Sequence, residues 1–108
     1  MKKIVLTLVL FVFVGFVSAQ IDKPLEEQYN VRGVYLLEKG DFMGAVEVFT
    51  MAIEHNANYA EAYYQRAFAL SKVSEGVEGL SYCKDLERAV ELKHPKAEDL
   101  VRKLNCKQ

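Results

Sequence analysis

The fold of this chain is decided by residues 26–59, which read EEQYNVRGVYLLEKGDFMGAVEVFTMAIEHNANY. Apolar residues recur there at helical spacing on both sides of Gly40-Asp41, which predicts helices at about 24–39 and 41–55. Gly40 is a residue type that ends helices, and Asp41 is one that begins them. Because the break between the two helices is so short, they are expected to lie antiparallel as a hairpin.

The same spacing returns about 34 residues further along the chain. A second copy that starts at Ala60 predicts helices at about 59–73 and 80–92, joined by a longer loop. The residue before Pro95 resists the helical conformation, so a new amphipathic helix is expected at about 95–105. Its apolar side and its charged side suit a helix that closes an array. The sequence therefore predicts one all-α domain.

The first copy carries an aromatic residue, a small one, a bulky one and two more small ones, at Tyr29, Gly33, Leu36, Ala45 and Ala52. This pattern resembles the tetratricopeptide repeat (TPR) family, whose repeats have such residues at about positions 4, 8, 11, 20 and 27. The resemblance implies antiparallel helical hairpins stacked as two TPR repeats, at about 26–59 and 60–93, plus a capping helix at about 95–105. It also implies a non-catalytic adaptor or scaffold that binds a protein or a peptide.

Residues 1–19 are predicted to be a signal peptide that is cleaved after Ala19. Lys2 and Lys3 precede an apolar run too short for a membrane-spanning helix, and Val17-Ser18-Ala19 has the small residues of a cleavage site. The mature domain is then expected to be residues 20–108, either periplasmic or secreted. The alternative is an uncleaved N-terminal anchor, and only in that case is contact with a membrane expected.

Charge and motifs exclude several classes of function. Removing Lys2 and Lys3 from the 14 basic residues leaves 12 against 15 acidic ones, a net charge of −3, so nucleic acid is not an expected partner. The sequence has no Gly-rich phosphate loop, paired-carboxylate motif or metal-ligand cluster. No cofactor, metal or small-molecule substrate is therefore expected, and the chain is predicted not to be an enzyme.

Two histidines leave one catalytic alternative open. The chain would then be an accessory of an envelope enzyme, with weak catalytic potential at His55 or His94. A histidine base needs a nucleophile to activate and a carboxylate to orient it, and neither stands at readable spacing from either ring.

The chain has two cysteines, Cys83 and Cys106, and an even count in an exported chain predicts that they pair in a disulfide. A Cys in the last repeat helix and another at the chain end also resemble a pattern of small exported bacterial TPR proteins. One alternative is two free thiols. The other is a zinc site completed by His55 and His94, although no closely spaced pair of Cys or His ligands is present.

The TPR resemblance also implies where a partner binds, because family members line a concave face with the first helix of each repeat. At the corresponding positions we predict a protein-binding groove of seven residues, Asn30, Val34, Leu37, Tyr64, Phe68, Ser71 and Lys72. Family members that grip a terminal carboxylate have Lys and Asn at such positions, and Val34, Tyr64 and Phe68 depart from that set. A mostly apolar strip suits a helix or an extended peptide instead.

Two alternatives to this groove follow from the short array. In the first, the terminal helix covers Tyr64 and Phe68, and the groove has nothing left to bind with. In the second, two repeats leave an apolar face for another copy, so the chain is a structural or self-associating module with no separate client.

Overall fold

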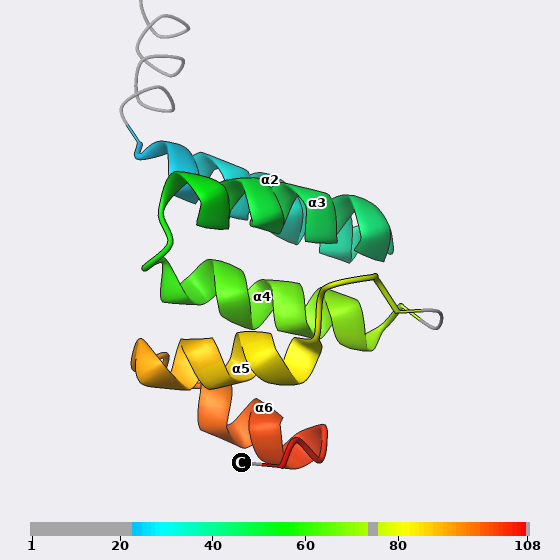
Figure 1. The fold of residues 1–108 in the computed structure, drawn as a ribbon. Coiled ribbons are helices and arrows are strands. Elements are labelled where there is room, and N and C mark those ends of the chain that lie inside the picture. Colours follow the sequence, from blue (N-terminus) through cyan, green and yellow to red (C-terminus); the bar gives the residue numbers. More distant parts are fainter. Residues whose placement is uncertain (1–22, 74–75, 108) are drawn as a thin grey trace, which may run out of the picture.

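The computed structural model describes residues 23–73 and 76–107, and this part of the chain is all-helical (Figure 1). Its helices are α2 (Leu25–Glu38), α3 (Phe42–His55), α4 (Ala60–Ser71), α5 (Tyr82–Glu91) and α6 (Ala97–Lys103). These residues contain no strand, only a β-bridge between Val77 and Leu80 in the loop before α5. The all-α prediction is confirmed, and each predicted helix is found with slightly shorter ends.

The signal peptide predicted at 1–19 lies outside the described residues. Among the helices of residues 23–73 and 76–107, none has the length and apolar character that crossing a membrane requires.

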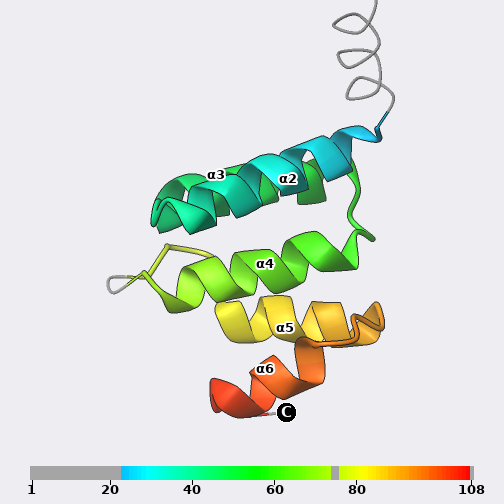
Figure 2. The ribbon, with the colours of Figure 1, turned by 180° about the vertical axis from the view of Figure 1, so that it is seen from behind.

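Each helix packs against the next one along the chain, from α2 to α6. Figures 1 and 2 show α2 and α3 as one hairpin at one end, α4 and α5 as a second hairpin, and α6 at the other end. α2 also contacts α4, so the first helices of the two hairpins are neighbours. This arrangement of consecutive hairpins is that of a helical repeat array.

The turn between α2 and α3 forms as its two residues predict. Gly40 has a φ of +78°, and the backbone N–H of Asp41 donates to the carbonyl of Leu36, which ends α2. The Asp41 carboxylate then accepts from the N–H of Gly44 at 2.9 Å and caps α3.

The same left-handed turn ends two other helices without a glycine. Lys93 has a φ of +63° after α5, and Asn105 has a φ of +56° after α6. In each turn the next N–H donates back to a helix carbonyl, from His94 to Ala89 and from Cys106 to Val101. These turns set the angle at which α6 leaves α5 and at which the chain end returns to it.

The two hairpin helices α2 and α3 approach closely at Gly33. A Cβ placed on Gly33 would lie 2.4 Å from Cε1 of the fully buried Phe49, so a side chain there would displace the ring. Phe49 belongs to the first core cluster, which joins α3 to α4 and consists of Ala45, Val46, Phe49, Ala69 and Leu70.

A second core cluster joins α4, α5 and α6, and it consists of Ala67, Leu86, Leu100 and Val101. The side chain of Tyr82, at the start of α5, packs against both clusters. The core is therefore continuous along the array, although each helix contacts mainly its neighbours in the chain.

A buried ion pair crosses this core. Arg66 of α4 donates from Nε and Nη2 to both carboxylate oxygens of Asp85 in α5, at 2.8 and 2.6 Å. Its remaining nitrogen, Nη1, donates to the hydroxyl of Thr50 in α3 at 3.2 Å. The side chains of Arg66 and Asp85 are only 10% and 7% exposed. One guanidinium thus links three consecutive helices.

Cys83 and Cys106 form a disulfide with a Cα–Cα distance of 5.4 Å, so the predicted pairing agrees with the structure. The free-thiol alternative is wrong, and both sulfurs are unavailable as zinc ligands. The bond attaches the end of the chain to the first turn of α5 and holds α6 against that helix.

We expect Asp85→Ala to lower the free energy of unfolding by about 3–5 kcal/mol, because it leaves the Arg66 guanidinium buried without its partner. The matched control is Glu91→Ala, which removes the exposed pair between Arg88 and Glu91 and should cost less than about 1 kcal/mol. Urea unfolding followed by circular dichroism measures both. Equal losses for the two variants would show that the buried pair is not a major support of the fold.

The double variant Cys83→Ser/Cys106→Ser should lose up to about 3.5 kcal/mol of unfolding free energy, since the bond closes a long loop in the unfolded chain. Reduction of the wild-type protein should produce the same loss, and reduction of the double variant should change nothing. Thiol labelling of unreduced, denatured protein should find no free cysteine. Two labelled thiols per chain are the contrary result.

Candidate protein-binding face

The seven predicted groove residues lie on two neighbouring helices. Asn30, Val34 and Leu37 are on α2, Tyr64, Phe68 and Ser71 are on α4, and Lys72 is the residue that ends α4. Six are partly exposed and Lys72 is fully exposed. Because α2 contacts α4, the two sets belong to one face of the array, seen in Figure 2 where α2 lies above α4.

The α2 side of this face is apolar and lies over the first core cluster. Val34 and Leu37 pack against that cluster while keeping part of their surface in solvent. Asn30 lies one turn before Val34, and its Oδ1 is buried with no hydrogen-bond partner among the described residues. An orphan acceptor of this kind gains a hydrogen bond when a donor reaches it.

The α4 side lies over the second core cluster, so Tyr64 and Phe68 share a different support from Val34 and Leu37. The Nζ atom of Lys72 lies 5.3 Å from the centre of the Phe68 ring, within cation–π range. Ser71 donates its hydroxyl to the carbonyl of Phe68 at 2.7 Å and so has no free proton for a partner. Tyr64, Phe68 and Ser71 are all partly exposed on this side, and Lys72 is exposed.

Tyr64 is held in place by His94. The two rings stack with centroids 4.3 Å apart and an interplanar angle of 12°. His94 Nδ1 accepts from the backbone N–H of Lys96, so the ring proton lies on Nε2, which meets the Glu61 carboxylate at 2.5 Å. The His94 side chain is only 6% exposed. This clasp ties the start of α4 to the turn between α5 and α6.

Both histidines have a carboxylate partner that the spacing of the sequence does not reveal. Glu61 lies 33 residues before His94, and His55 has Glu26 at 3.8 Å. No sequence spacing reveals such pairs, because they depend on how the hairpins stack. Among the described residues, no hydroxyl or thiol forms a hydrogen bond with His94.

The alternative that the terminal helix covers the α4 rings holds in part. Tyr64 and Phe68 pack against a cluster that includes Leu100 and Val101 of α6, yet both rings remain partly exposed. Tyr64 is also stacked on His94, and Val34, Leu37, Tyr64 and Phe68 each keep part of their surface exposed on the face.

Acidic residues gather at one end of the face, at the starts of α2 and α4. Burial raises the pKa of Tyr59, and the nearby carboxylates of Glu27, Glu61 and Glu26 raise it further, because the phenolate would add a negative charge beside them. Lys72 lies at the opposite end of α4. The face is therefore acidic at the starts of α2 and α4, whereas its other end carries both Lys72 and the exposed Glu38.

The described residues contain no group of three His, Cys, Asp or Glu side chains arranged to hold a metal ion. The face is built from apolar and amide side chains with charges at its ends. Such a surface fits a polypeptide better than a reaction centre.

Comparison with known proteins supports the repeat. The chain is similar to the "Tetratricopeptide repeat protein 36 homolog" of Nematostella vectensis, with 37% identity over 73 residues. The match covers 68% of this chain and only 39% of the relative's length. No family model matches the chain, and neither does any solved structure. The likeness supports a TPR-like repeat and, with it, a protein-interaction module.

Proposed function

We propose that this protein is a non-catalytic adaptor that binds a helix or an extended peptide of another protein on the face formed by α2 and α4. The observation that carries the proposal is the partial exposure of Val34, Leu37 and Phe68 on the two first helices of consecutive hairpins. The similarity to a protein named for its tetratricopeptide repeats supports a function in protein binding.

The end charges of the face favour one polarity of the bound segment. A basic residue of the partner is attracted to the acidic starts of α2 and α4, and an acidic residue to Lys72, while apolar side chains lie on the strip between them.

We further propose that the protein works outside the cytoplasm, in the bacterial envelope or as a secreted protein, after removal of residues 1–19. The N-terminal sequence and the disulfide between Cys83 and Cys106 support this compartment, because structural disulfides persist where conditions are oxidising.

Peptides selected on the purified domain from a displayed random library should contain apolar residues flanked by opposite charges. Val34→Ala and Phe68→Ala should each weaken their binding by about 1 kcal/mol or more, as is typical of interface anchors. Met43→Ala, a truncation of a more exposed apolar residue on α3, is the control and should leave binding unchanged. Selected peptides that ignore both groove variants would place the binding surface elsewhere.

Export is tested by intact-mass measurement of the protein produced in its own cells. We expect a species that begins at Gln20 and contains the Cys83–Cys106 bond. A protein that retains Met1 and fractionates with membranes would mean that the N-terminal segment is an anchor.

A further inference from the structure

Two large apolar side chains stand out from α2 on the side away from α3. Val31 is 55% exposed and Tyr35 is 56% exposed. Gly33 faces Phe49 of α3, and a side chain two residues further along a helix points to nearly the opposite side. Val31 and Tyr35 are one turn apart and form a stripe beside, and separate from, the apolar strip of Val34 and Leu37.

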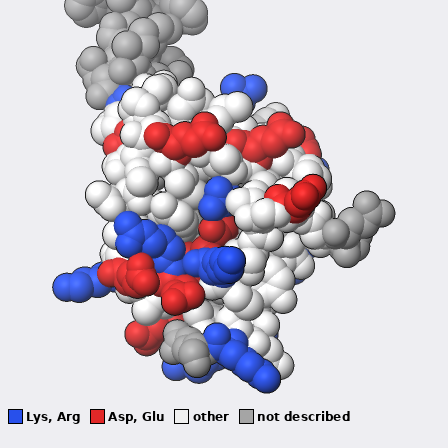
Figure 3. Space-filling model, viewed as in Figure 1, with Lys and Arg blue, Asp and Glu red and all other residues white. Residues whose placement is uncertain are grey.

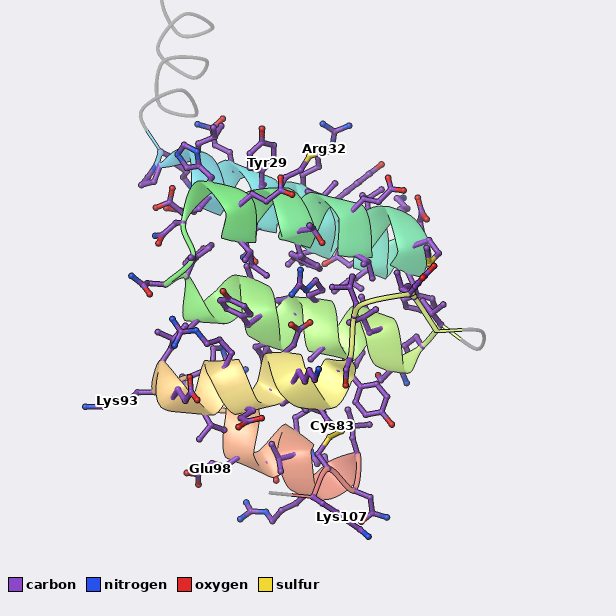
Figure 4. The ribbon with its side chains drawn as sticks, in the orientation of Figure 1. Tyr29, Arg32, Cys83, Lys93, Glu98 and Lys107 are labelled. Carbon is purple, nitrogen blue, oxygen red and sulfur yellow. A yellow bond between two sulfur atoms is a disulfide. The ribbon has the colours of Figure 1, made fainter. Side chains whose placement is uncertain are left out.

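The α2 stripe borders a hollow of about 440 Å³ that contains no carboxylate. Its lining is Lys23, Gln28, Val31, Arg32 and Tyr35. The Arg32 side chain projects away from the other helices in Figure 4. Beyond the hollow, Lys39 places its Nζ atom 5.4 Å from the centre of the Tyr35 ring. Arg32 and Lys39 therefore border the stripe with positive charge on one side, whereas the exposed Glu38 follows Tyr35 by three residues on the other side.

α3 has the complementary stripe on the opposite side of the hairpin. Met51 follows the buried Phe49 by two residues and so points away from α2, and it is 44% exposed. Glu47 and Glu54 flank it, and both are exposed. α3 carries no Lys or Arg, and Figure 3 shows acidic side chains over this end of the array. This second stripe is apolar and anionic.

The two stripes match in spacing as well as in charge. Arg32 and Lys39 are seven residues apart with Tyr35 between them, and Glu47 and Glu54 are seven apart with Met51 between them. The two charge pairs and the apolar contact can therefore form together in a single alignment of an α2 stripe with an α3 stripe. None of the four charged residues has an ion pair within the described part of the chain.

We propose that the occupant of the α2 stripe is the α3 stripe of a second copy of this protein. The stripes lie on opposite sides of one hairpin, so a copy cannot satisfy its own stripes and the contact is head-to-tail. Each added copy leaves one stripe free at either end, and such a contact extends into a chain of copies unless its rotation closes a ring. This inference does not rest on the peptide-binding function, which uses the face of α2 and α4.

Sedimentation velocity tests the contact. The purified wild-type protein should sediment as larger species as its concentration rises at low salt, and this association should weaken at about 0.5 M salt because exposed ion pairs are screened. Arg32→Glu/Lys39→Glu and Glu47→Lys/Glu54→Lys should each weaken self-association about tenfold or more. Mixing these two variants should restore association, since the reversed charges then face each other.

The matched control is Lys96→Glu/Lys107→Glu. It changes the net charge by the same amount as Arg32→Glu/Lys39→Glu, but near α6, and it should leave self-association at the wild-type level. Val34→Ala and Phe68→Ala should also leave it unchanged, which separates this contact from the peptide-binding face. Circular dichroism confirms that each variant folds. A wild-type protein that stays monomeric up to about 1 mM overturns the proposal, and so does a mixture of the two swapped variants that fails to associate.

Discussion

The buried contact of Arg66 with Asp85 and Thr50 is the constraint on which the stacking of the two hairpins depends. Two helices that pack through apolar side chains can slide against each other. A guanidinium that donates to both oxygens of one carboxylate, in contrast, holds them in one geometry. The pair joins α4 to α5, and the bond to Thr50 extends the same restraint to α3. These bonds restrain how α4 sits against α3 and α5.

The disulfide and the His94 clasp restrain the other end of the array in a comparable way. α6 is short and has few residues to bury, so its packing on α5 gains from a covalent bond at one end and from the Glu61–His94 contact at its start. The charged outer side of α6 and these two restraints make it a cap. At the opposite end, no helix of the described part covers the outer sides of α2 and α3.

The sequence predicts the local features of this fold well, because each depends on residues close together in the chain. Helical periodicity locates each helix of the described residues, Gly40-Asp41 locates the turn between α2 and α3, and the small Gly33 marks a close contact between α2 and Phe49 of α3. The turn at Lys93 is predicted only through Pro95, since a lysine with a positive φ leaves no trace in the sequence. The even cysteine count predicts the disulfide because only one pairing is possible.

The interactions that fix the candidate face join residues far apart in the chain, and no local pattern reveals them. Nothing in the spacing of Arg66 and Asp85, or of Glu61 and His94, distinguishes these residues from solvated surface charges. The groove positions follow from the TPR resemblance. It locates Tyr64 and Phe68 on α4, but it does not reveal that Tyr64 stacks on His94. A family resemblance predicts where a residue lies in the fold, whereas the side chains that it contacts depend on the sequence of this chain.

The physical distinction between the two surfaces of α2 lies in what supports them. Val34 and Leu37 rest on a core cluster and keep only part of their surface exposed, so a partner there adds to packing that already exists. Val31 and Tyr35 stand more than half exposed with Arg32 and Lys39 on one side, so an occupant that brings apolar surface and carboxylates complements that side. Helical repeats bury such outer sides against a neighbouring repeat, and a short array has few neighbours of its own. A second copy supplies the missing neighbour from α3, whose Met51, Glu47 and Glu54 provide that chemistry.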